Sequence, residues 1–193
     1  FGGGIYSTNS YSPTLSNLII TGNTADSGGG IMLWYASANI SNCIIKGNTA
    51  SGNGGGIGAG FGAAVIITNS VINGNGSGAY GGGISTGGGS ALNIINSTII
   101  GNSAVHGGGG VSGDSNSPAT ITNSIIRDNT ANEGPQIGLY FSTITATYSN
   151  IKGGYAGTGN IDANPLFLNQ AAGYFNLQPG SPSIDTGNNT TVP

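Results

Sequence analysis

Ionisable side chains are few in this 193-residue chain, and they limit the chemistry that it can perform. It has six carboxylates, three basic residues and one histidine. Cleaving a sugar chain needs carboxylates clustered on one face, often with a base or Ca²⁺. The best pair is His106 and Glu133, which lie four residues after Asn102 and Asn129 in successive repeats. We expect the two to be neighbours, as a weak catalytic candidate or as a surface ion pair.

Composition argues against several other function classes. Only 5% of the residues are charged and the net charge is −3, which does not fit a nucleic-acid partner. No apolar run approaches the length of a membrane span, so no membrane insertion is expected. The glycine clusters precede no helix on which a phosphate could sit. They also lack the Asp of calcium-binding nonapeptides. We therefore expect no metal and no cofactor.

The elements that carry these side chains are indicated by a repeat of 25 to 27 residues. Clusters of glycine recur along the chain, and each is followed by one aliphatic residue. A degenerate "GPQ" continues the series at its last member. These aliphatic residues are Ile5, Ile31, Ile57, Ile84, Val111 and Ile137. Such registered columns are the mark of a solenoid built from stacked copies of one unit.

Two asparagine columns run in register with the glycines. The first consists of Asn17, Asn42, Asn69, Asn96, Asn123 and Asn150, and the second, six residues later, of Asn23, Asn48, Asn75, Asn102 and Asn129. Asn tolerates the left-handed conformation of a corner and can hydrogen-bond to its equivalent one coil away. We interpret both columns as structural ladders. Between the two columns lies a second aliphatic series: Ile20, Ile45, Ile72, Ile99 and Ile126.

The segments between the corners alternate apolar and polar residues with period two, which predicts strands and excludes helices. Each repeat offers three short strands with inward aliphatic residues. One coil cannot bury these alone, but stacked coils paired in parallel can. The sequence thus predicts an all-β fold, a single-stranded parallel β-helix of about six coils, over residues 1–150. The register fails after Asn150, so residues 151–193 are expected to form an irregular segment that covers the end or flank of the helix.

Two surfaces are candidates for binding. Aromatic residues gather in the loop that follows the first strand of each coil: Trp34, Tyr35, Phe61, Tyr140 and Phe141. They are interpreted either as a platform for a sugar ring or a neighbouring chain, or as simple cover for a flank. The outward residues of the second strand include many Thr, as in ice-binding solenoids. Ile66, Ile95 and two Asn interrupt those rows, so plain solvent-exposed strand is the default interpretation.

The paired motifs "GGGI" and "IxxN" resemble the repeats of polymorphic outer membrane proteins. The tail from Gly159 to Gly187 resembles the closing segment of secreted bacterial β-helix proteins with a choice-of-anchor Q region. The resemblance implies a right-handed helix, in line with the usual hand of crossover connections. It also implies an extracellular setting, secreted or attached to the cell surface.

Three hypotheses about function follow. The first is a non-enzymatic structural or adhesive protein that self-associates end to end or laterally, as filaments or a surface layer. The second is a β-helix that binds or cleaves polysaccharide, and the third is ice binding.

Overall fold

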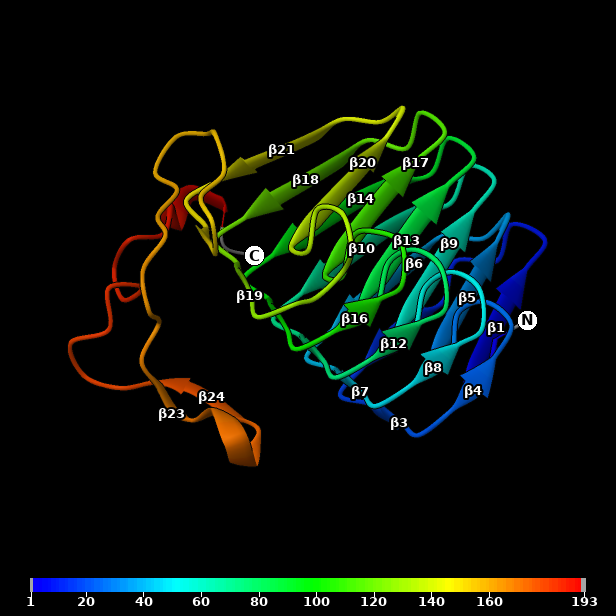
Figure 1. Ribbon diagram of the computed structural model, residues 1–193. Coiled ribbons are helices and arrows are strands. Elements are labelled where there is room, and N and C mark those ends of the chain that lie inside the picture. Colours follow the sequence, from blue (N-terminus) through cyan, green and yellow to red (C-terminus); the bar gives the residue numbers. More distant parts are fainter. Residues whose placement is uncertain (1, 192–193) are drawn as a thin grey trace.

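The chain folds as a stack of parallel coils, as the repeat predicts. The structure is a computed structural model that describes residues 2–191. Phe1 and residues 192–193, the outer ends of the two predicted segments, lie outside the described residues. Every coil passes through the same three sheets in the same order, and successive coils pair in parallel (Figure 1). The all-β parallel β-helix is therefore confirmed, with about five turns where about six coils were expected.

Three sheets of six parallel strands form the walls of the stack. Sheet A contains β1 (Ile5–Thr8), β5 (Ile31–Trp34), β9 (Ile57–Gly60), β13 (Ile84–Gly87), β17 (Val111–Asp114) and β20 (Ile137–Tyr140). Sheet B contains β2 (Thr14–Ser16), β6 (Ala38–Ser41), β10 (Ala64–Thr68), β14 (Ala91–Ile95), β18 (Ala119–Thr122) and β21 (Ile144–Thr147). Sheet C contains β3 (Ile19–Thr21), β7 (Ile44–Lys46), β11 (Val71–Asn73), β15 (Thr98–Ile100), β19 (Ile125–Arg127) and β22 (Asn150–Ile151).

The sequence predicted three strands per coil, but four of the coils contain a fourth, short strand, and these strands form a fourth, narrow sheet. Sheet D contains β4 (Thr24–Ala25), β8 (Thr49–Ala50), β12 (Gly76–Ser77) and β16 (Ser103–Ala104). Its strands have two residues each, so no alternation of apolar and polar residues can be seen in the sequence. They exist because the second Asn column directly before them holds the backbone of successive coils in register.

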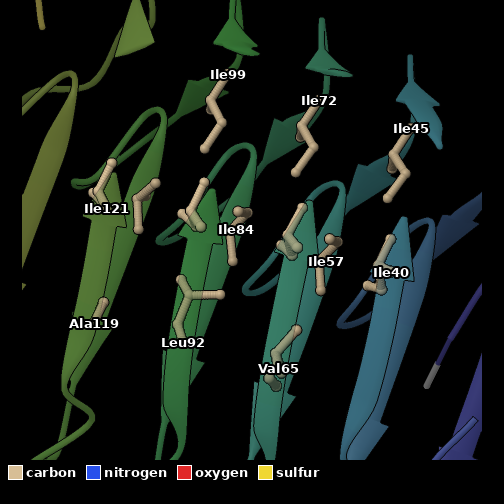
Figure 2. Close-up of a cluster of buried hydrophobic side chains, with 14 of the residues drawn as sticks. Ile40, Ile45, Ile57, Val65, Ile72, Ile84, Leu92, Ile99, Ala119 and Ile121 are labelled. Atoms are coloured by element: carbon tan, nitrogen blue, oxygen red, sulfur yellow. The ribbon is translucent and has the colours of Figure 1, made fainter. Parts of the chain in front are cut away.

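The core is a set of aliphatic columns that run along the axis of the stack (Figure 2). Ile31, Ile57 and Ile84 from sheet A face Ile45, Ile72 and Ile99 from sheet C, and all are 0% exposed. Sheet B adds Ile40, Ile67, Ile94 and Ile121. The ends of the first column, Ile5 and Ile137, are only partly buried. Complete burial of one such side chain contributes roughly 1.5–3 kcal/mol, so the internal coils carry most of the stability.

The second Asn column is a buried hydrogen-bonded ladder. The Nδ2 group of Asn48 donates to Oδ1 of Asn75 at 3.0 Å, and Asn75 donates likewise to Asn102 at 2.9 Å. The same Nδ2 groups also donate to main-chain carbonyls of the neighbouring coil. The ladder ends where Asn129 donates to Oε1 of Gln136. Buried amides of this kind are stable because their donors and acceptors find partners.

The first Asn column has a different role from the one predicted. Its members adopt the left-handed conformation, with φ of 57° at Asn17 and 48° at Asn69. Their side chains point outward and are exposed or half-buried. Among the described residues, no side-chain hydrogen bond joins Asn17, Asn42, Asn69 and Asn96 to one another. This column is therefore a row of corners and not a ladder, because a left-handed residue at a sharp bend turns its side chain to solvent.

Asn150 does not belong to that column, which corrects the sequence prediction. The last coil is two residues shorter than the one before it. Ile95 pairs with Thr122, which lies 27 residues later, whereas Thr122 pairs with Thr147, which lies only 25 residues later. The corner of the last coil is accordingly Tyr148, with φ of 50°. Asn150 pairs with Ile125 in sheet C. Ile151 then follows Ile126 in the core column and is 1% exposed, so the aliphatic register continues beyond residue 150.

The rest of the chain covers the last coil and one flank. Ile161 bridges to Asn150, and Tyr155 packs against the core from the same end. The antiparallel hairpin of β23 (Phe167–Asn169) and β24 (Tyr174–Leu177), with the 3₁₀ turn η1 (Gln170–Ala172) between them, lies beside sheet C (Figure 1). A second 3₁₀ turn, η2 (Asn189–Thr191), ends the described chain. Just before it, the backbone N–H of Asn188 donates to Oδ1 of Asn123.

Candidate functional site

The outer face of sheet A is hollowed at its centre. The first and third residues of each strand point into the core, so the second and fourth point outward. In β9, β13 and β17 most of these outward residues are small. They are Gly58 and Gly60, Ser85 and Gly87, and Ser112 beside the larger Asp114. With larger side chains on the strands and loops around them, they form the floor of a groove of about 460 Å³, which we call the sheet A groove.

One wall of this groove is an aromatic cluster that the sequence placed among the ligand candidates. The rings of Tyr35 and Phe61 are stacked, with centroids 4.9 Å apart and planes inclined by 28°. The Trp34 ring lies 4.3 Å from that of Phe61 and contacts Phe61 at an inclination of 52°. Tyr35 and Phe61 both have left-handed backbones, with φ of 54° and 59°, and occupy equivalent corners of adjacent coils. The corner geometry therefore holds the rings in one cluster.

The opposite wall is formed by Tyr80 and Tyr140, whose rings meet edge to face at 4.7 Å. Burial raises the pKa of the Tyr140 phenol above its ordinary value, and the negative charge of Glu133 raises it further. Phe141, the next residue, is 94% exposed and lines the groove mouth. Tyr80 was not among the sequence candidates, although it directly precedes the Gly81–Gly83 cluster.

Asp114 and Ser112 are two of the polar residues that line the groove between these aromatic walls. Asp114 is exposed and ends β17. The Ser112 side chain is buried and lines the groove, and its Oγ has no hydrogen-bond partner among the described residues. An unsatisfied buried hydroxyl carries a free-energy cost of about 1–3 kcal/mol. The groove thus combines ring faces, a carboxylate and an unpaired hydroxyl, which is the usual make-up of a site for a hydroxylated small ligand.

The comparisons with known proteins agree with this architecture. The family described as a right-handed β-helix region matches residues 3–170. The chain belongs to the right-handed β-helix family. The hand expected from the sequence is therefore confirmed. Neither the search of curated proteins nor that of solved structures gave a match. The family assignment therefore supports the fold, and any inference about a ligand must come from the geometry of the groove.

His106 and Glu133 are not the side-chain pair that the sequence predicted. Glu133 lines up with Gly107 in the neighbouring coil, and the contact to His106 is a main-chain hydrogen bond from the Glu133 N–H. The His106 ring packs on Tyr80 at 5.4 Å instead, whereas Glu133 is the neighbour of Tyr140. In the part of the chain described, no ion pair joins His106 to Glu133. The one-residue offset arises because coil length changes between these turns.

The clearest ionic cluster of this β-helix lies at the opposite flank, around the end of sheet C. Arg127 forms an ion pair with Asp162 at 2.7 Å, and Lys152 forms one with Asp128 at the same distance. The hydrogen bond from Lys152 lowers the pKa of the Asp128 carboxyl, with burial opposing it. The hydrogen bond from Arg127 lowers that of Asp162. Gln170 also donates to Asp128, so the cluster ties the C-terminal segment to the coils.

The Thr-rich face of sheet B keeps its predicted alternation, but with a shifted last coil. Thr145 and Thr147 pair with Thr120 and Thr122, so they continue the two outward rows in the last coil. Ile66, 41% exposed, interrupts the first row. Ser149 is instead buried and belongs to a column of hydroxyls inside the corner. Residues 2–191 contain no group of three or more His, Cys, Asp or Glu side chains that could hold a metal ion, and no helix that is long and apolar enough to cross a membrane.

Proposed function

We propose that this protein is a non-enzymatic, extracellular β-helix, secreted or attached to a cell surface, that adheres to glycans through the sheet A groove. The observation that carries the proposal is the juxtaposition of two aromatic walls over a glycine and serine floor. Sugar rings offer flat C–H faces to aromatic rings and hydroxyls to polar groups. The groove volume of about 460 Å³ falls in the range of small-ligand sites.

Binding without cleavage is what this groove supports. A glycosidase needs two carboxyl groups about 5–10 Å apart on either side of the bond. Among the described residues, Asp114 is the one carboxylate that lines the groove, and Glu133 is engaged with Tyr140 at its wall. The proposal therefore assigns no catalytic residue, and release of reducing or unsaturated sugars from any bound polymer would contradict it.

A glycan array probed with the purified protein tests this function. Trp34→Ala removes a ring of the first wall, and we expect it to weaken binding by about fivefold or more, since one stacked ring contributes about 1 kcal/mol or more. Tyr11→Ala is the matched control, because Tyr11 is an aromatic residue, 70% exposed, outside the sheet A groove. Binding of no glycan, or equal loss in both variants, would overturn the proposal.

Self-association is a second candidate, favoured by the exposure of Phe141 and by the exposed stacked pair of Tyr35 and Phe61. Lateral contact would bury these rings. End-to-end contact would use β1 to β4, which are the outermost strands of their sheets among the described residues, because edge strands are templates for further pairing. Sedimentation over a range of concentrations, with negative-stain microscopy, tests both routes. A Phe141→Ser variant should reduce lateral association only, and a monomer at every concentration would exclude this candidate.

A further inference from the structure

We propose that the sheet A groove selects uncharged glycans and rejects polymers that carry carboxylate or sulfate groups. This inference rests on the proposed function and names the ligand class of the same site. It follows from where the charges of the chain lie. Asp114 lines the groove, and Glu133 stands beside Tyr140 at its wall. Both are acidic, so an anionic sugar would meet like charge there.

No basic side chain is available to compensate. The chain has three Lys and Arg residues in total, and all of them belong to sheet C or follow it. Lys46 ends β7, Arg127 ends β19 in an ion pair with Asp162, and Lys152 is paired with Asp128. None of the three lines the sheet A groove. A uronate bound beside Asp114 would meet a like charge and no counter-charge, so partial desolvation of its carboxylate there is unfavourable.

The polar groups that remain match sugar hydroxyls. The Asp114 carboxylate can only accept hydrogen bonds, and sugar hydroxyls donate them. The Ser112 Oγ can donate or accept, and it has no partner among the described residues. It stands in one outward column with Ser85 and Gly138. A hydroxylated ligand would provide the partner that this buried oxygen lacks.

The floor provides a variant that fills the groove without disturbing the fold. Gly87 lines the groove, has no left-handed φ, and a Cβ added there meets nothing within 4 Å. Gly87→Leu therefore places a side chain where the ligand would lie. Gly76→Leu is the matched control. Gly76 lies in sheet D, outside the groove, also has no left-handed φ, and its added Cβ meets only the Ser103 hydroxyl, at 3.6 Å.

Affinity electrophoresis and calorimetry with neutral polymers (β-glucan, galactomannan, starch) and acidic ones (polygalacturonate, dextran sulfate) test the inference. We expect the affinity for at least one neutral polymer to be higher by about tenfold or more than the affinity for either acidic polymer. Gly87→Leu should abolish this binding and Gly76→Leu should not. Asp114→Lys should raise the affinity for polygalacturonate by about tenfold.

The outcomes separate the two proposals. If the wild type binds acidic polymers as tightly as neutral ones, the charge selection is wrong while glycan binding stands. If neutral polymers bind but Gly87→Leu has no effect, the binding site is elsewhere and this assignment falls. If no polymer of either kind binds, the proposed function itself is overturned.

Discussion

Asn75 and Asn102 form one rung of a ladder in the interior, with Nδ2 of Asn75 donating to Oδ1 of Asn102 at 2.9 Å. Both side chains are at most 1% exposed. Each amide also donates to a main-chain carbonyl and accepts from a main-chain N–H. The rung thus joins three coils through groups that have no access to water.

Removing an internal rung should therefore be costly. We expect Asn75→Ala to lower the free energy of unfolding by about 3 kcal/mol, because it removes the buried acceptor of the Asn48 main-chain N–H and Nδ2 and the donor to the Ile45 carbonyl. Asn23→Ala, at the partly buried end of the ladder, should cost about 1 kcal/mol. Urea unfolding checks both values, and equal costs would show that burial does not set the strength of the ladder.

The corner column should respond differently. Asn69 holds a left-handed φ of 48°, and its side chain is exposed. Asn69→Ala is expected to destabilise the protein by about 1 kcal/mol, because a Cβ without a polar group strains that conformation. Asn69→Gly should be close to neutral. If Asn69→Gly were less stable than Asn69→Ala, this column would stabilise the fold through a side-chain contact and not through its backbone conformation.

Gly82, in the middle of a glycine cluster, should not tolerate any side chain. An added Cβ would lie 2.5 Å from the Ser103 carbonyl carbon and 2.6 Å from the Gly109 oxygen, and both atoms are main chain of adjacent turns. We expect Gly82→Ala to destabilise the protein by about 3 kcal/mol or to prevent folding, as overpacking against backbone does. Gly87→Ala, with open space around its Cβ, should leave the midpoint of thermal unfolding unchanged or slightly raised.

Acid should weaken the attachment of the C-terminal segment. Ion pairing lowers the folded-state pKa of Asp128 and Asp162 below the unfolded value of about 3.9. Their contribution is therefore complete above roughly pH 5 and is lost as the pH falls through the folded pKa values. In limited proteolysis between pH 5 and 2, we expect cleavage after residue 163 to become faster as the pH falls. Asp128→Asn should show early cleavage already at pH 5, and Asp114→Asn, outside the cluster, should follow the wild type.

The sequence alone was sufficient for the fold because each determinant repeats locally. A left-handed corner, an inward Ile and a buried Asn each recur in register, so the columns of Ile31 or Asn48 could be drawn without coordinates. The serine column inside the corner was missed. There the Ser70 N–H donates to the Ser97 hydroxyl, and the series continues through Ser124 to Ser149. In a chain so rich in serine, a repeated Ser gives little signal.

Tertiary structure decided what depends on changes in coil length and on contacts between distant residues. A last coil of 25 residues instead of 27 put Tyr148 at the corner and moved Asn150 into sheet C. The groove likewise depends on Tyr80 and Tyr140, which are far apart in the chain and whose rings meet at 4.7 Å across the one coil that lies between theirs. Periodicity determines which residues face outward. Side-chain size on several successive coils decides where that surface becomes hollow, and no single repeat contains this information.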